Sequence, residues 1–139
     1  MNKNNQFSLT LPGSWQDQTL FTYHGPLENG VQHNLIISID TKIPKKMDIT
    51  TYAYKQLESS RIELPGFVIL KEGEKILANG RVGFEVVYRY RASDEVAIYQ
   101  KQFFLFMETK GYCFTASFSK KTLKTIANDV DAMIESFIP

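Results

Sequence analysis

Hydrophobic and polar residues alternate along most of this chain, and the alternation predicts a series of β-strands. Such a pattern places apolar side chains on one face of a strand, which then packs on a core. It marks residues 6–11, 19–24, 33–41, 84–91, 96–107 and 112–118, with shorter candidates at 67–70 and 74–77. Short turns join the last three long segments, which predicts an antiparallel meander.

Two other segments have the three-to-four spacing of an amphipathic helix. The first follows Asp48, a favourable N-cap, and ends at Leu64-Pro65-Gly66, since proline and glycine stop helices. The second, residues 123–137, carries an almost continuous apolar stripe. The order of strands, helix, strand meander and helix predicts an α+β fold. In it, two main helices pack on an antiparallel sheet, and residues 1–139 form a single domain.

Composition and charge narrow the classes of protein. The net charge is +1 and no long basic run is present, so the electrostatic basis for binding nucleic acid is missing. A single cysteine cannot form an internal disulfide. No apolar run approaches the roughly 20 residues of a membrane span, and residues 1–6 show no apolar leader segment. We expect a cytoplasmic protein without stable membrane insertion.

Residues capable of catalysis or metal binding do not form a known motif. His24, His33 and Cys113 lack the paired spacing of metal ligands, and Cys113 lies in the middle of a predicted strand. Asp94-Glu95 belongs to a predicted hairpin turn. Phosphate-binding loops and nucleophile elbows are missing. The sequence predicts a protein that is not an enzyme and uses no cofactor or metal.

The strand end Phe103-Phe104-Leu105-Phe106-Met107 is apolar on both faces. We expect a helix to cover Phe104 and Phe106. The opposite face then needs its own cover, either from the same chain or from another chain at a dimer interface or client groove. A mixed groove of apolar and small polar groups would suit an apolar helix. The candidate surface consists of Leu20, Thr22, Ile36, Val87, Tyr99, Phe103, Leu105 and Met107.

The block Trp15-Gln16-Asp17-Gln18, which follows Pro12, resembles the DcrB-related family. The resemblance is greatest to the effector-associated (Eag) chaperones of bacterial type VI secretion. Read locally, Trp15 follows a Pro-Gly turn and is predicted to be a core anchor. Further matches follow in order at 35–38 with Asp40, 55–58, 64–67, 88–90, 102–104 and 137–139. The resemblance implies a PsbP-like fold, a curved antiparallel sheet with helices packed on it, and a homodimer.

The resemblance also implies a function. Eag chaperones bind the N-terminal transmembrane segments of secreted toxic effectors, keep them soluble in the cytoplasm and assist their loading onto the secretion spike. The grip in that family involves apolar residues of the second strand, which correspond here to Leu20 and Thr22. Leu20 has the expected character, whereas Thr22 is polar where the family tends to be aliphatic. The alternative is a non-catalytic ligand-binding or structural dimerisation domain of the wider family.

Overall fold

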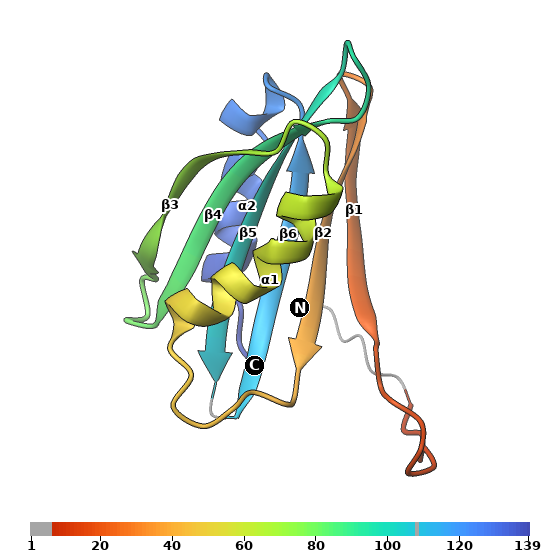
Figure 1. Ribbon diagram of the computed structural model, residues 1–139, viewed down its shortest axis with the longest axis vertical. Helices are drawn as coiled ribbons and strands as arrows, with labels where there is room; N and C mark the ends of the chain where they lie inside the picture. The colour runs from red at the N-terminus through yellow and green to blue at the C-terminus, as the bar shows by residue number, and fades with distance from the viewer. Residues whose placement is uncertain (1–6, 108) are drawn as a thin grey trace.

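One six-stranded antiparallel sheet forms the centre of the protein, with a helix on each face (Figure 1). The computed structural model describes residues 7–107 and 109–139. The strand order is β1-β2-β6-β5-β4-β3. The strands are β1 (Leu20–Glu28), β2 (Val31–Asp40), β3 (Val68–Ile76), β4 (Val82–Arg91), β5 (Ala97–Met107) and β6 (Lys110–Phe118). The helices are α1 (Ile49–Glu63), the 3-10 turn η1 (Thr122–Lys124) and α2 (Ala127–Glu135).

This architecture confirms the predicted α+β class and the β4-β5-β6 meander. Residues 1–6, on which the expectation about a leader segment rests, lie outside the described part. Within the described part, no helix is both long and apolar enough to cross a membrane.

Helix α1 begins and ends as the sequence predicts. A side-chain oxygen of Asp48 accepts a hydrogen bond from the Thr51 amide at 2.8 Å, which satisfies a donor that the helix leaves free. The chain leaves the helix through Leu64 and Pro65, and Gly66 takes a positive φ of 65°. The inner side of α1 packs on β4 and β5 in a cluster centred on Tyr52, Ala53, Leu57, Phe84, Val86, Tyr88 and Phe104.

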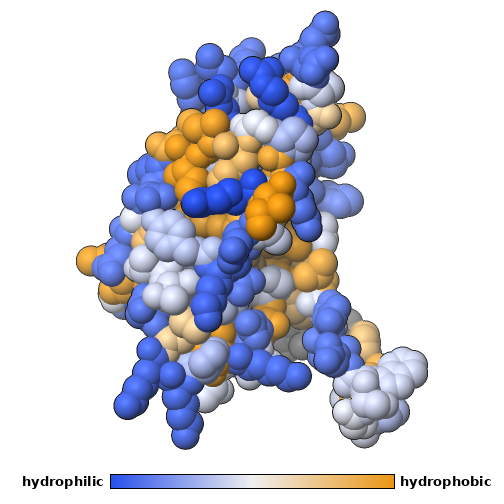
Figure 2. Space-filling view, viewed as in Figure 1, coloured by the Kyte–Doolittle hydropathy of each residue, from blue (hydrophilic) through white to orange (hydrophobic). Residues whose placement is uncertain are grey.

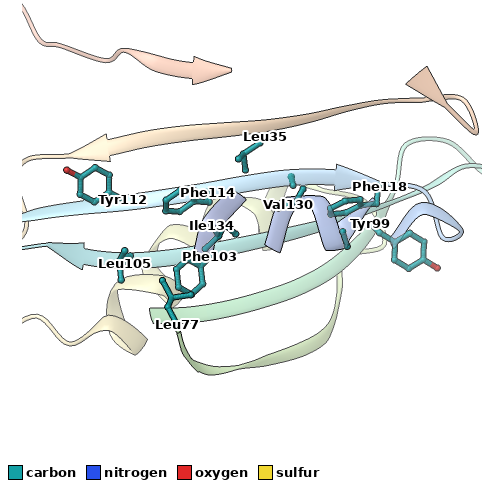
Figure 3. Packing of buried hydrophobic residues seen from close by; sticks show 12 residues of the cluster. Leu35, Leu77, Tyr99, Phe103, Leu105, Tyr112, Phe114, Phe118, Val130 and Ile134 are labelled. Atoms are coloured by element: carbon teal, nitrogen blue, oxygen red, sulfur yellow. The ribbon is translucent and has the colours of Figure 1, made fainter. Parts of the chain in front are cut away.

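Helix α2 covers the other face of the sheet (Figure 3). Its buried residues Ala127, Val130 and Ile134 pack against a second cluster that includes Phe103, Leu105 and Phe114. The continuous helix predicted at 123–137 is divided into η1 and α2. The division falls at Thr125, whose backbone leaves helical geometry (φ −122°, ψ −69°), while the buried Thr122 hydroxyl bonds His33 Nε2 on β2 at 2.7 Å and holds η1 against the sheet.

Three predictions at the edges of the sheet are wrong. The two short strands expected around Gly73 are one strand, β3, with a bulge between Ile69 and Lys71. The turn dipeptides Gly25-Pro26 and Asn29-Gly30 together predict a loop or hairpin connection. Asn29-Gly30 forms the turn between β1 and β2, whereas Gly25-Pro26 lies inside β1 at a second irregularity. Residues 7–19, called the N-terminal arm below, form no strand. The predicted turn is present, since the Trp15 amide bonds the Pro12 carbonyl at 3.0 Å, but the Trp15 side chain is 69% exposed and anchors no core.

Candidate functional site

The sheet divides the eight candidate residues between its two faces. Residues opposite each other in neighbouring strands point to the same face. Thr22 is opposite Ile36, and Leu20 is opposite Ser38, on the face that α1 partly covers. Val87, Tyr99, Phe103, Leu105 and Met107 lie on the face that α2 covers. The structure therefore does not bring the eight residues together.

The set on the α2 face is covered by the chain itself. Phe103 and Leu105 are each 1% exposed, and Tyr99 and Val87 are also buried. Met107 is partly buried against the same cluster. The sequence allowed two possibilities for the Phe103 and Leu105 face of β5: burial by the same chain or burial by another chain. The structure shows burial by the same chain. Of these five residues, only Met107 keeps part of its surface exposed.

Leu20, Thr22 and Ile36 belong instead to an uncovered strip of the α1 face. One cross-strand row shows the change from covered to open: Val86, Gln102, Thr115, Ile36 and Thr22 follow one another from β4 to β1. Val86 is completely buried under α1, whereas Thr22 is exposed. We call this strip, formed by β1, β2 and β6 beside α1, the open face.

The open face combines apolar and small polar side chains. Leu20 is 59% exposed and Ile36 is half-buried. Figure 2, which views this side of the molecule, shows hydrophobic side chains exposed beside the hydrophilic outer surface of α1. The polar members at the surface of the strip are Thr22, His24, Asn34, Ser38, Thr115 and Ser117. The acidic side chain on this face of β2, Asp40, lies at the end of the strand, where it accepts a hydrogen bond from the Tyr52 hydroxyl of α1 at 3.1 Å.

A ladder of polar side chains separates the open face from the core under α1. Gln100 Nε2 donates to Ser117 Oγ at 3.0 Å, and Gln102 Nε2 donates to Thr115 Oγ1 at 3.1 Å. The prediction missed these glutamines. A signal for them is present, because Gln100 and Gln102 share a strand face with Phe104 and Phe106 at a spacing of two.

Gln102 carries an unpaired acceptor. In the part of the chain that the structure describes, its Oε1 is the only buried side-chain nitrogen or oxygen without a hydrogen-bond partner. A buried acceptor in this condition has a free-energy cost of about 1–3 kcal/mol.

Cys113 and His33 lie on different faces of the sheet and have different surroundings. Burial raises the pKa of the Cys113 thiol to about 11, which keeps it protonated near neutral pH. Cys113 is opposite Ser38 on the α1 face. His33 is buried on the α2 face, where Nδ1 bonds the Pro26 carbonyl at 2.8 Å and Nε2 bonds Thr122. His33 and Cys113 thus lie on opposite faces of the sheet.

Buried charges gather on the α2 face. Glu85 Oε2 lies 3.5 Å from Lys101 Nζ and 3.3 Å from Lys75 Nζ, and Lys101 also reaches Asp131 of α2. Burial works to raise the pKa of Glu85, but the ammonium groups of Lys101, Lys75 and Lys71 together hold this pKa below its ordinary value. These side chains line a cavity of about 300 Å³. Because the charges already pair with one another, the cluster joins α2 to the sheet.

Known structures share this architecture. A Pseudomonas aeruginosa protein of unknown function, PA94, described as a putative regulator, superposes with a TM-score of 0.75 at 20% identity, covering 94% of this chain and 90% of its own. Cyanobacterial PsbP (CyanoP) from Synechocystis sp. PCC 6803 has a TM-score of 0.56 at 16% identity, covering 94% and 98%. LpqN of Mycobacterium tuberculosis, involved in cell envelope biogenesis, has a TM-score of 0.50 at 14% identity, covering 77% and 62%. At these identities the likeness defines the fold, which is PsbP-like.

The sequence defines the family more closely. The DcrB family model matches residues 7–136, so this chain belongs to the DcrB family. No curated protein matches the sequence.

Proposed function

We propose that this protein is a cytoplasmic, non-enzymatic chaperone for a type VI secretion effector. It binds the effector's N-terminal transmembrane helices on the open face, shields them from water, and assists loading of the effector onto the secretion spike. It acts as a homodimer. DcrB family membership and the resemblance of the Trp15 block to Eag chaperones support this proposal.

The observation that carries the proposal is the open face beside α1. Helix α1 packs mainly on β4 and β5 and reaches β6 and β2 only at one end, where Tyr52 lies next to Gly111 and bonds Asp40, so β1 and the rest of β2 and β6 have no helix on that side. Three neighbouring strands span roughly 10 Å between their outer axes. An α-helix has a similar diameter, and packed helices lie about 8–10 Å apart. One client helix therefore fits next to α1 and completes the layer.

The chemistry of the open face suits a transmembrane helix. Leu20 and Ile36 offer apolar contact for lipid-facing side chains. Thr22, Ser38 and Thr115 offer hydrogen bonds to the small polar residues through which membrane helices associate. Binding would remove apolar area from water, which is the driving force for shielding.

Co-expression with the secreted protein encoded next to this chain tests the proposal. The measurement is the soluble fraction of that protein's N-terminal segment. Leu20→Asp and Ile36→Asp place a charge against the client helix, and we expect each to lower the soluble fraction. Ile62→Asp is the matched control, because Ile62 is 76% exposed on α1. If the wild-type chain leaves solubility unchanged, the proposal fails.

The alternative is a non-catalytic ligand-binding or structural dimerisation domain. The uncovered apolar side chains of the N-terminal arm favour dimerisation as an activity in its own right. Leu20→Asp separates the two functions. Loss of the client from an intact dimer supports the chaperone, whereas dissociation of the dimer without a client effect supports the structural domain.

A further inference from the structure

A charged hollow lies between β3 and α2, on the sheet face that α2 covers. Its volume is about 300 Å³, and its lining includes Glu85 and Lys101, whose side chains are only 8% and 10% exposed. Burying these charges carries a desolvation cost that apolar residues of similar size would avoid. Buried ionisable groups in a cleft are candidates for a binding site. The attachment of α2 accounts for the ion pairs but not for the hollow beside them.

The edge strand β3 is shaped to border this hollow. The bulge before Lys71 shifts the alternation of the strand, so that Lys71 lies opposite Val87 and points to the α2 face. Gly73 lies opposite Glu85, and a Cβ there would meet no atom within 4 Å. Glycine inside a strand often marks a place where a ligand approaches the backbone closely. Lys71, Gly73 and Lys75 share one face, and the glycine leaves an open cradle between the two lysines.

Positive charge is in excess around the cradle. The cluster consists of three ammonium groups and two carboxylates, those of Lys71, Lys75, Lys101, Glu85 and Asp131. Three positive and two negative groups leave an excess of one positive charge. Lys101 reaches both carboxylates. In the described part of the chain, Lys71 pairs only with Glu85 Oε1, at 3.3 Å, and its side chain is 74% exposed. An ammonium group has three N–H donors, so Lys71 retains donors for a further acceptor.

The two other acidic residues that border the hollow do not cancel this excess. Glu72 lies opposite Val86, and its Oε1 accepts a hydrogen bond from the Tyr54 hydroxyl of α1 at 2.6 Å. Glu74 lies opposite Phe84, which belongs to the hydrophobic cluster under α1. Both carboxylates are therefore on the α1 side of the sheet, away from the cradle.

We propose that the hollow binds a small organic anion, with its carboxylate or phosphoryl group over Gly73 between Lys71 and Lys75. Such a group balances the excess charge and accepts charge-assisted hydrogen bonds, which are stronger than neutral ones. A volume of about 300 Å³ is at the lower end of the range for ligand pockets, which suits a small molecule rather than a protein segment.

This inference does not depend on a client. The hollow is on the α2 face of the sheet, whereas the open face lies beside α1 on the other side. Failure of the client experiment and failure of anion binding are therefore separate results.

NMR titration of the isotope-labelled full chain tests the proposal. The probes are sodium phosphate and sodium succinate, each compared with sodium chloride at the same ionic strength. We expect saturable shifts in the amide signals of residues 71–75 with at least one probe. The probe that binds more tightly shows whether the site prefers a phosphoryl or a carboxylate group. Shifts that do not saturate, or equal shifts beside exposed lysines over the whole surface, would overturn the proposal.

Variants of one lysine locate the site. Lys71→Gln removes the exposed ammonium group, and we expect the dissociation constant of the tighter probe to rise at least about fivefold. Lys71→Arg keeps the charge and should retain most of the affinity. Lys55→Gln is the matched control, because Lys55 is exposed on α1. The spectrum without probe shows that each variant is folded. Unchanged affinity in folded Lys71→Gln, or an equal loss in Lys55→Gln, would contradict the assignment of the anion to this hollow.

Discussion

Lys101 Nζ on β5 lies 2.9 Å from Asp131 Oδ1 on α2, and this ion pair joins the sheet to the helix that covers Phe103 and Leu105. The Lys101 side chain is almost fully buried and also faces Glu85. Hydrophobic contact and charge pairing thus hold α2 in the same place.

Replacing Lys101 tests the strength of this attachment. Lys101→Met removes one partner of a buried network and leaves its carboxylates poorly compensated, so we expect the free energy of unfolding to fall by about 3 kcal/mol. Urea unfolding followed by circular dichroism measures the change. Lys71→Met is the control, because the Lys71 side chain is exposed and its pair with Glu85 contributes at most about 1 kcal/mol. Equal losses of unfolding free energy in Lys101→Met and Lys71→Met would contradict the conclusion that the buried Lys101 pair attaches α2 to the sheet.

The same network predicts how stability depends on pH. The pKa of Glu85 is lower in the folded chain than its ordinary value of 4.5, so its stabilising contribution is complete above that pH. The contribution is lost as the pH falls through the folded pKa. We expect the urea midpoint to decrease below about pH 4.5. In Glu85→Gln the urea midpoint should be lower than that of the wild type at neutral pH, and it should fall less as the pH decreases. If the urea midpoint of the variant falls with pH as steeply as that of the wild type, the prediction is contradicted.

Gly83 on β4 makes room for the ring of Phe103. A Cβ at Gly83 would lie 2.2 Å from Phe103 Cζ and 2.6 Å from the Phe104 carbonyl oxygen, so backbone as well as side chain obstructs it. We expect Gly83→Ala to lower the free energy of unfolding by about 3 kcal/mol through overpacking. Gly13→Ala is the matched control, since a Cβ there meets no atom within 4 Å. Its effect should stay within about 0.5 kcal/mol.

Cys113 should be slow to react with thiol reagents. With a pKa of about 11, its thiolate is scarce at pH 8, and we expect alkylation at least about 100-fold slower than that of an ordinary cysteine. The reference is Ser59→Cys in a Cys113→Ala background, which places the thiol on the exposed surface of α1. Unfolding in urea should bring the rate for Cys113 to the reference value. Fast alkylation of the folded chain would show that the α1 face opens readily at Cys113.

Local patterns predicted those parts of the fold that depend on neighbours in sequence. The Asp48 cap, the stop after Leu64 and the cover of Phe104 and Phe106 by α1 follow from spacing and capping chemistry. The alternation within β5 also assigned Phe103 and Leu105 correctly to the opposite face. These features need only a few consecutive residues, which is why one sequence contains enough information for them.

Pairing between distant strands was not predictable in this way. β2 pairs with β6, at one side of the β4-β5-β6 meander, and this pairing places Ile36 next to Thr115. The candidate surface is therefore divided between the two faces of the sheet. Gly25-Pro26 predicts a loop locally, but an edge strand tolerates proline because one side of it needs no hydrogen-bond donor. Alternation in residues 7–11 predicts a half-buried strand, but the structure leaves Phe7 and Leu9 exposed, because an alternating pattern does not specify a strand to pair with.

The β1-β2 hairpin has a consequence for how this fold can evolve. β1 joins the sheet through β2 alone, and Leu20 and Thr22 belong to neither hydrophobic cluster. Substitutions there leave the cores unchanged, so selection can alter what the open face binds while stability is maintained elsewhere. A lineage with this fold can therefore acquire new specificity through changes in one hairpin, without passing through unstable intermediates.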